Sequence, residues 1–367
     1  MPPPEPERED RLSAVRTAAV VVNHNGGDKV LACLAALVEL REPPSAIVVV
    51  DNASTDDSPD RIAERFPSVR VIALPDNAGP SVARNVGLRA VDADVVLLID
   101  DDVYLRADAL DRLLAAQAET GAAVVAPRVV LHPERELVQC DGGAAHPIGT
   151  LRLRHGFRPV AELPVERTEV GACIGACLLV DRAAALDAGG FEELFFFYFE
   201  DLEFSLRMRS LGCNLVCEPR AVAFHDRGSG TPELSFRGAG GYPARRAYLS
   251  HRNRWLCMLI HYRRRTLILL GPLLTLYEAM SLGFFIVNGW PQHWVRAWAW
   301  LLSHRREIAA RRGPMQARRS RSDAALLEGG TLPLAPNVVR RPELRRAIGA
   351  FSRFADGYFA SCRGFLR

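Results

Sequence analysis

Three consecutive carboxylates, Asp100, Asp101 and Asp102, are the strongest chemical signal in this sequence. They follow residues 95–99, an apolar run that is too short for a helix and predicts a buried strand. In an open α/β sheet, ligands bind at the carboxyl ends of strands. Crowded carboxylates there repel one another, and Mg²⁺ or Mn²⁺ relieves the repulsion because hard cations prefer oxygen ligands and often bridge a carboxylate to a diphosphate. The triplet predicts a divalent-metal site, and the alternative is an acidic turn that caps the next helix.

A second acidic pair, Glu200 and Asp201, follows the aromatic run at residues 195–199. We predict a strand for this run and a helix for residues 202–210, which places Asp201 at a helix N-terminus, where the dipole favours the ionised form. A carboxylate there can accept a proton from a hydroxyl group. Two structural alternatives remain: Asp201 only caps the helix, or Glu200 pairs with Arg207.

The elements that must position these residues alternate between strand and helix. Strands are predicted at residues 17–22, 46–50, 69–74 and 95–99. The predicted helices between them are 28–40, a second that ends near residue 66, and 81–91. This order is typical of an α/β fold with a mainly parallel sheet and helices on both faces. Polar residues follow every strand, so we expect them to converge at one edge of the sheet. No Gly-x-Gly-x-x-Gly follows the first strand, which argues against a dinucleotide-binding enzyme.

The chain after the triplet is less regular. We predict a helix at residues 108–120, a strand at 122–131, a loop or small hairpin over the site at 132–166, and a strand at 170–180. The last predicted strand of this part ends at His225.

The order of these motifs resembles the inverting family 2 glycosyltransferases, particularly the rhamnosyltransferase-like group, over residues 17–255. The matching motifs are Val20-Val-Val-Asn-His-Asn25, Val50-Asp-Asn-Ala-Ser-Thr-Asp56, Asp76-Asn-Ala-Gly79, Ala83-Arg-Asn-Val-Gly87, Leu97-Leu-Ile-Asp-Asp-Asp102, Gly189-Gly-Phe-Glu-Glu193, Tyr198-Phe-Glu-Asp201 with Arg207, and His225. Each motif alone is weak, and their shared order makes the resemblance specific.

The resemblance implies a GT-A-type nucleotide-diphospho-sugar transferase fold, a divalent metal (Mg²⁺ or Mn²⁺) and a single-displacement transfer that inverts the sugar. It implies donor-binding roles for Val22, Asn23, Asn25, Asp51, Asn52, Asn77, Gly79, Arg84, Asp100 and Asp101, and metal contacts for Asp102, Asp100 and His225. Asp201 is the expected base, with Glu200 as the neighbouring alternative. His225 as a strand-end hydrogen-bonding residue and Arg84 as a solvated helix residue remain open.

The C-terminal third is basic and rich in tryptophan. Residues 240–322 contain fifteen arginines against Glu278 and Glu307, together with all five tryptophans, beside long apolar runs. Arginine and tryptophan beside apolar helices favour an anionic membrane surface over nucleic acid. Residues 266–290 are long enough to span a bilayer but contain Glu278 near the middle, and residues 292–312 suit one interfacial helix. We expect in-plane helices rather than a span, and the alternative is a soluble helical subdomain.

These patterns divide the chain into a disordered tail at 1–16, a catalytic domain at 17–240, a membrane-associated helical region at 241–318, and a linker with a C-terminal helix at 319–367. The eight cysteines are scattered and no secretory signal is visible, so reduced thiols at the cytoplasmic face of the membrane are expected.

The sequence therefore predicts an inverting, metal-dependent glycosyltransferase that acts on a glycan or polyprenyl-linked acceptor in cell-envelope polysaccharide synthesis. The donor expected by resemblance is dTDP-rhamnose, followed by UDP-hexoses. The alternatives are a sugar nucleotidyltransferase and a catalytically inactive membrane-bound scaffold with this fold. The sugar, the base, the linkage and the oligomeric state are not encoded in any motif.

Overall fold

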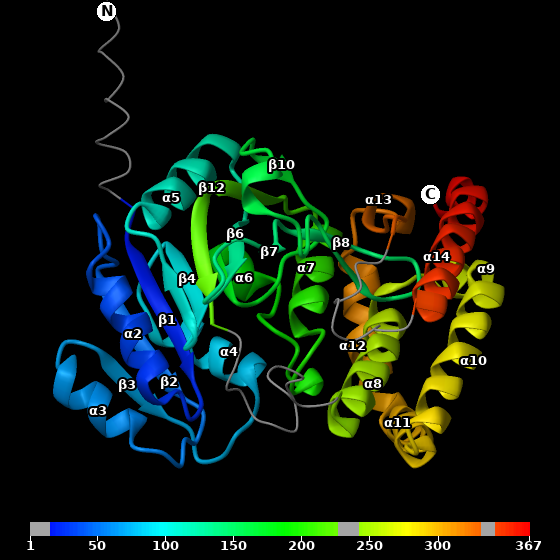
Figure 1. Cartoon of the computed structure of the whole chain (residues 1–367), viewed down its shortest axis with the longest axis horizontal. Helices are drawn as coiled ribbons and strands as arrows, with labels where there is room; N and C mark the ends of the chain where they lie inside the picture. The colour runs from blue at the N-terminus through cyan, green and yellow to red at the C-terminus, as the bar shows by residue number, and fades with distance from the viewer. Residues whose placement is uncertain (1–14, 227–241, 332–341) are drawn as a thin grey trace, which may run out of the picture.

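A computed structural model describes residues 15–226, 242–331 and 342–367 (Figure 1). Nearly all of the tail expected at residues 1–16, and part of the linker expected after residue 319, lie outside the described residues. The strands are β1 Thr17–Asn23, β2 Ala46–Asp51, β3 Arg70–Ala73, β4 Val95–Asp100, β5 Val103–Leu105, β6 Val124–Leu131, β7 Val138–Cys140, β8 Gly143–Ala145, β9 Leu151–Leu153, β10 Thr168–Glu169, β11 Cys177–Asp181 and β12 Leu215–His225.

The α-helices are α2 Gly27–Val38, α3 Ser58–Arg65, α4 Pro80–Ala90, α5 Ala109–Thr120, α6 Arg182–Asp187, α7 Glu200–Ser210, α8 Ala244–His261, α9 Arg264–Leu269, α10 Gly271–Val287, α11 Pro291–Ser303, α12 Arg305–Arg318, α13 Asp323–Leu326 and α14 Pro342–Arg363. Short 3-10 turns occur at Val160–Glu162, Glu193–Phe195 and Gly364–Leu366.

One mixed sheet organises the chain, with the main strand order β10-β12-β6-β11-β4-β1-β2-β3. The predicted parallel part is confirmed, because β1 pairs in parallel with both β2 and β4, and β2 pairs in parallel with β3. β11 lies antiparallel between β4 and β6, and β12 runs parallel to β6. The sequence pattern therefore predicted the first half of the sheet correctly.

Alternating residues of the central strands face two separate cores. Ala19 and Val21 of β1 pack with α2, α3 and α5, whereas Val20 and Val22 pack with α4, α6 and α7. Figure 1 shows these helices on opposite faces of the sheet. Burial on both faces explains why the strands read as continuous apolar runs in the sequence.

The register of the parallel strands brings their polar ends together. Asn23 lies opposite Asp51, and Val22 lies opposite Asp100. The short strand β5 pairs with the end of β12, where Val103 lies opposite His225. This pairing places Asp102 beside that histidine. The strand ends thus form one polar edge, as the sequence predicted.

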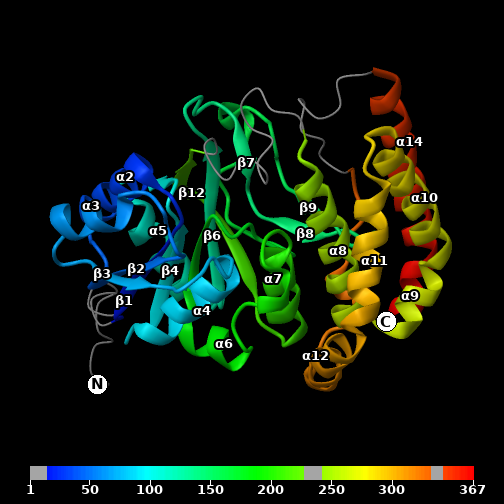
Figure 2. The same ribbon diagram turned by 90° about the horizontal axis from the view of Figure 1, so that it is seen from below.

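The C-terminal helices pack as a second layer beside α7 and the β8–β9 hairpin (Figure 2). α8 lies nearer to the sheet than α9, α10 and α14 do (Figures 1 and 2). Two polar contacts tie this layer to the rest of the protein. The buried His261 Nε2 is 2.8 Å from Glu203 Oε1 of α7, and the partly buried Arg311 Nε is 2.7 Å from Glu192 Oε1.

The strand predicted for the aromatic run at residues 195–199 is wrong. Phe196, Tyr198 and Phe199 have positive φ values of 59°, 67° and 70°. The fully buried amide of Asn253 on α8 donates to the carbonyl oxygens of Phe195, Phe197 and Tyr198. Because one side chain gathers three carbonyl groups, the segment cannot alternate its carbonyl directions as a strand does.

The strand predicted at residues 170–180 is only partly correct. β11 begins at Cys177, and the preceding residues form an irregular segment that ends beside Arg84. A Cβ atom on Gly175 would lie 2.9 Å from the Arg84 guanidinium, so this glycine allows the backbone to approach the arginine closely.

The apolar run at 266–290, which Gly271 and Pro272 interrupt, forms two helices: α9 ends at Leu269 and α10 begins at Gly271. The prediction of one helix at 292–312 is wrong, because this stretch divides into α11 and α12. Among the described residues, no helix has both the length and the apolar character needed to cross a membrane. Trp298 contacts Trp255 at 5.0 Å between ring centroids, and Arg252 of α8 lies over Trp300, so these tryptophans pack inward. The terminal helix predicted from residue 342 is confirmed as α14.

Candidate active site

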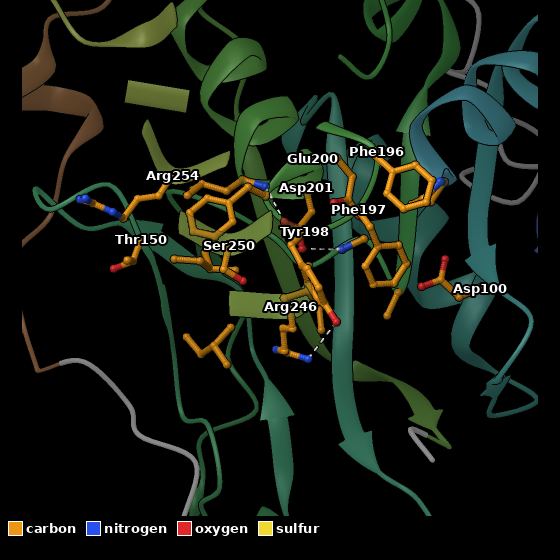
Figure 3. A pocket seen from close by; sticks show the side chains of 18 of the residues that line it. Asp100, Thr150, Phe196, Phe197, Tyr198, Glu200, Asp201, Arg246, Ser250 and Arg254 are labelled. Atoms are coloured by element: carbon orange, nitrogen blue, oxygen red, sulfur yellow. Dashed lines mark hydrogen bonds between the residues drawn. The ribbon is translucent and has the colours of Figure 1, made fainter. Parts of the chain in front are cut away.

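A cleft of about 740 Å³ lies at the polar edge of the sheet (Figure 3). One half is lined by the ends of the parallel strands and includes Asp100, Asp101 and Asp102. The other half is walled by α8, α10, the β8–β9 hairpin and the loop at residues 196–199. Glu200 and Asp201 line the same cleft (Figure 3). The two acidic groups found in the sequence therefore share one cavity, although a hundred positions separate them.

The three aspartates point at three different partners. Asp100 Oδ1 accepts from Arg84 Nη2 at 2.7 Å, and Asp101 Oδ2 accepts from the backbone N–H of His24 at 3.0 Å. Asp102 Oδ1 lies 3.2 Å from His225 Nε2. Burial raises the pKa of Asp100 and raises that of Asp101 well above its usual range, with the neighbouring carboxylates adding to both shifts. This crowding is the electrostatic conflict that a bound cation would relieve.

Asp102 and His225 form the part of the site that fits a divalent cation. His225 Nδ1 lies 2.9 Å from the side-chain oxygen of Gln139, so Nδ1 carries the ring hydrogen and Nε2 faces Asp102. The carboxylate oxygen is a ligand that Mg²⁺ and Mn²⁺ prefer, and the imidazole nitrogen lies close enough to contact the same cation. Among the residues that the structure describes, no cluster of three or more acidic, histidine or cysteine ligands occurs, so this pair would need further ligands from the substrate or water.

Arg84 connects the two acidic groups and is not a solvated helix residue. Its guanidinium is almost fully buried and donates to Asp100, to Glu200 Oε1 at 3.3 Å and to the Gly175 carbonyl at 3.1 Å. Glu200 therefore pairs with Arg84, whereas Arg207 pairs with Glu203 and Glu192. The Arg84 guanidinium thus links Asp100 at the strand ends to Glu200 at the start of α7.

The acidic pair lies in the first turn of α7, which begins at Glu200, two residues earlier than predicted. Burial and the nearby Asp201 carboxylate raise the pKa of Glu200 to about 7. Burial also raises the pKa of Asp201, although its oxygens accept from the N–H groups of Leu202 at 2.7 Å and Gly175 at 3.3 Å. Burial outweighs the helix-terminus effect expected from the sequence, and it makes Asp201 a better proton acceptor.

We expect Glu200→Gln to flatten the pH dependence of stability. The pKa of Glu200 rises from its ordinary value of 4.5 to about 7 on folding. The contribution of this group to the free energy of unfolding is therefore complete at a pH below its pKa in the unfolded chain, and it is lost as the pH rises through about 7. Urea unfolding at pH 5 and pH 8 measures this loss. The fall in the free energy of unfolding between the two pH values should be smaller in the variant, and equal falls would refute the raised pKa.

The predicted nucleotide-binding residues divide into two groups. Val22, Asn52, Asn77, Arg84, Asp100 and Asp101 line the cleft. Asn52 is fixed there, since its Nδ2 donates to Asn77 Oδ1 at 3.0 Å and its Oδ1 accepts from the Ala78 N–H at 3.0 Å. His24 also lines this end, and its Nδ1 lies 2.9 Å from the Asn52 carbonyl oxygen.

Four predicted residues are not among those that line the cleft: Asn23, Asn25, Asp51 and Gly79. The buried Asn23 donates to Asp51 Oδ1 at 2.7 Å, and Asn25 Oδ1 accepts from the Thr55 N–H at 2.7 Å, so they brace the loops after β1 and β2. Gly79 has a φ of 86°, and a Cβ atom there would lie 2.2 Å from the Phe196 carbonyl oxygen. These four residues therefore stabilise the segments that line the cleft without lining it themselves.

Sequence reasoning missed residues that α8 and α10 contribute, chiefly Asn253 and Arg246. The available signal was the polar pair Arg252-Asn253 directly before the apolar second half of α8, because polar residues on a buried helix face need a specific partner. Arg246 lines the cleft, and its Nη1 donates to the Tyr198 hydroxyl at 3.0 Å (Figure 3). Neither residue belongs to the strand-end pattern that reveals the rest of the site.

Comparison with known proteins agrees with this geometry. Residues 18–185 match the family model "Glycosyl transferase family 2". N-acetylglucosaminyl-diphospho-decaprenol L-rhamnosyltransferase of Mycobacterium tuberculosis is 29% identical over 235 residues, which cover 58% of this chain and 76% of that protein.

Two solved structures share the fold. Mannosyltransferase PcManGT from Pyrobaculum calidifontis, in complex with GDP-Man and Mn²⁺, has a TM-score of 0.50 and 17% identity and is covered over 90% of its chain by 85% of this one. GalNAc-T7, crystallised with UDP, GalNAc and Mn²⁺, has a TM-score of 0.57 and 14% identity, with 73% of this chain covering 51% of that one. These likenesses establish the GT-A-like α/β fold.

Proposed function

Since this chain is a glycosyltransferase of family 2, in the rhamnosyltransferase-like group, we propose that it moves a sugar with inversion from a nucleotide-sugar donor to a glycan or lipid-linked acceptor. The observation that carries the proposal is the meeting of Asp100–Asp102 and Glu200–Asp201 in one cleft, linked by the buried Arg84. Cell-envelope polysaccharide synthesis is the proposed pathway, supported by the named activity of the mycobacterial relative.

The donor is proposed to bind at the strand ends. The loops after the parallel strands line one end of the cleft with His24, Asn52 and Asn77. Their amide and imidazole groups can form hydrogen bonds with a nucleoside. Asp102 and His225 are the residues that would hold Mg²⁺ or Mn²⁺, which stabilises negative charge on a leaving diphosphate when bound. dTDP-rhamnose is the first donor to test because of the relative's name, with UDP- and GDP-sugars next.

Asp201 is proposed as the general base. The acceptor hydroxyl oxygen forms a bond to the anomeric carbon while the bond from that carbon to the diphosphate oxygen breaks. The hydroxyl proton passes to the Asp201 carboxylate, and the nucleoside diphosphate leaves with the bonding electrons. The pKa of Glu200, about 7, leaves this carboxyl group partly protonated near neutral pH. Glu200 positions the Arg84 guanidinium beside Asp201 and the acceptor hydroxyl. Attack opposite the leaving group inverts the sugar.

A sugar nucleotidyltransferase is less well supported by the loop after β1. Such an enzyme needs a basic phosphate-binding loop there, and Lys29 is instead engaged by Asp226, with Nζ 2.9 Å from its carbonyl oxygen and 3.3 Å from its carboxylate. An inactive scaffold is less well supported, because Glu200 and Asp201 line the same cleft as Asp100, Asp101 and Asp102.

Nucleoside diphosphate release tests the function. Purified protein with Mn²⁺ should release nucleoside diphosphate from one member of a panel containing dTDP-rhamnose, UDP-hexoses and GDP-mannose, and EDTA should abolish the release. Release that is equal for every donor, or unaffected by EDTA, would contradict a specific metal-dependent donor site.

Attachment to the cytoplasmic face of an anionic membrane is proposed for α9 and α10. Exposed apolar side chains run along their outer side, including Ile268, Leu276, Met280, Phe284 and Val287. Three exposed arginines, Arg263, Arg264 and Arg265, lie at the start of α9. An apolar stripe with cations at its end matches an anionic lipid surface.

We expect Leu276→Glu to weaken binding to phosphatidylglycerol vesicles by about tenfold, since a buried leucine side chain contributes about 1.5–3 kcal/mol. Val38→Glu on α2 is the matched control, because both side chains are 43% exposed. Vesicle co-sedimentation measures the partition coefficients. Equal binding of the two variants would refute this surface.

A further inference from the structure

We propose that Asn253 of α8 is a positioning residue for sugar transfer, which holds the loop at residues 196–199 in the conformation that places Asp201 in the cleft. This inference rests on the role proposed for Asp201 above. It follows from the hydrogen bonds of the Asn253 side chain, from the backbone conformation of the loop, and from the two parts of the active site that the loop contacts.

The Asn253 side chain is a buried donor to the backbone of this segment. Its exposed fraction is 0%, and its Nδ2 donates to the carbonyl oxygens of Phe195 at 2.9 Å, Phe197 at 2.9 Å and Tyr198 at 2.7 Å. Its Oδ1 accepts from Arg252 Nε at 2.8 Å, and Arg252 Nη2 also donates to the Phe195 carbonyl at 2.9 Å. Two neighbouring side chains of α8 thus fix the directions of these carbonyl groups.

These bonds hold the loop in a conformation that its own residues disfavour. Phe196, Tyr198 and Phe199 have positive φ values, which are uncommon for bulky side chains. Positive φ in such residues persists only where the surroundings enforce it, and it occurs often at active sites. The amide of Asn253 supplies that constraint here. Without it, we expect the loop to relax toward negative φ values and its carbonyl groups to turn away from α8.

The loop contacts both the first turn of α7 and the segment before α4. The Phe199 carbonyl accepts from a backbone N–H of α7 at 2.8 Å, which closes the turn that contains Asp201. The Phe196 carbonyl lies so close to Gly79 that a Cβ atom there would be 2.2 Å from its oxygen. Gly79 precedes α4, the helix that carries Arg84. A change in the loop would therefore move Asp201 relative to the strand ends.

α8 has other polar attachments to the rest of the protein. His261 at the end of the helix contacts α7, and Arg254 Nη1 donates to the Ile148 carbonyl at 2.6 Å. By contrast, the loop that Asn253 holds lines the cleft beside Asp201 (Figure 3). Loss of the amide should therefore affect the rate of transfer more than the stability of the fold.

Asn253→Ala tests the inference in the full chain. We expect kcat for nucleoside diphosphate release to fall by about 10²-fold, because a displacement of about 1 Å at a reacting group can cost that much. Hydrogen exchange of the amides in residues 199–203, measured by mass spectrometry, should become at least about tenfold faster as the loop opens locally. Exchange in β1 and β4 should stay unchanged. The metal-dependent shift in melting temperature with nucleoside diphosphate should be retained, because the strand ends are not altered.

Gln316→Ala is the matched control. The Gln316 amide on α12 also gathers backbone carbonyl groups, since its Nε2 donates to Ile260 at 2.9 Å and to His261 at 2.8 Å. Gln316 is not among the residues that line the cleft, so the control should keep the wild-type rate and the wild-type exchange at residues 199–203. Asn253→Ser, whose hydroxyl has one hydrogen to donate, replaces the alanine variant if that variant does not fold.

Three results would overturn the assignment: a rate in Asn253→Ala equal to that of the control, unchanged exchange in residues 199–203, or a loss of rate accompanied by faster exchange throughout the sheet. The last result would show that Asn253 only stabilises the fold. Absence of both nucleoside diphosphate release and a nucleotide-dependent shift in the wild type counts instead against the proposed function.

Discussion

Asp201→Asn is expected to reduce sugar transfer by about 10²–10⁴-fold, the range that a positioned general base contributes. The asparagine keeps the size of the side chain but cannot take the acceptor proton. Its amide oxygen can still accept from Leu202 N, as the carboxylate does at 2.7 Å, so the first turn of α7 should be retained. Transfer is measured as the initial rate of nucleoside diphosphate release, and donor binding as the nucleotide-dependent shift in melting temperature.

Asp111→Asn is the matched control for this substitution. Burial raises the pKa of Asp111 as it does that of Asp201, but Asp111 lies on α5 and is not among the residues that line the cleft. The control should transfer sugar at the wild-type rate. If Asp201→Asn is as active as the control while Glu200→Gln is inactive, the base is Glu200 and the assignment made here is wrong.

Arg84→Met should be the most destabilising single change at the site, costing about 3–5 kcal/mol near neutral pH. The variant leaves the Asp100 and Glu200 carboxylates in a buried place without their shared cation. Loss of Arg84 raises the pKa of both carboxylates further, so protonation relieves the penalty at low pH and the penalty grows as the pH rises. Urea unfolding of the variant and the wild type at pH 5 and pH 8 measures both effects.

Arg61→Met is the control that separates burial from charge pairing. Arg61 also bridges two carboxylates, those of Asp28 and Asp57, but this group is exposed to solvent. Exposed pairs contribute about 0–1 kcal/mol, so this variant should be nearly neutral at both pH values. Equal destabilisation by the two substitutions would show that the buried bridge has no special electrostatic role.

The strand-end half of the cleft could be predicted from the sequence, because the register of parallel strands brings their polar ends together. Each apolar run ends in a polar residue, and parallel pairing places Asn23 beside Asp51 and Val22 beside Asp100. The sequence could not divide the roles of Asp100, Asp101 and Asp102. Their directions depend on Arg84, His24 and His225, which come from three separate elements.

The half of the cleft that α8 and α10 line could not be predicted from the sequence, for a different reason. The aromatic run at residues 195–199 has the composition of a strand, and only the distant Asn253 forces it into left-handed turns. Likewise, Glu278 appeared to be an isolated charge in an apolar segment. Its partner Arg254 lies on another helix, and the pairing is visible only once α8 and α10 are packed together. Long-range polar pairing of this kind leaves no local pattern.

A thermal-shift panel tests the central claim, that the strand-end cleft is a metal-dependent nucleotide-sugar site. The panel combines Mn²⁺ or Mg²⁺ with dTDP, UDP and GDP in the wild type and in Asp102→Ala. A ligand at a hundredfold excess over its Kd stabilises the folded state by about 2.7 kcal/mol, so binding raises the melting temperature. We expect a shift with one nucleotide that needs the metal and is lost in Asp102→Ala. No shift with any nucleotide, or an equal shift in the variant, would contradict it.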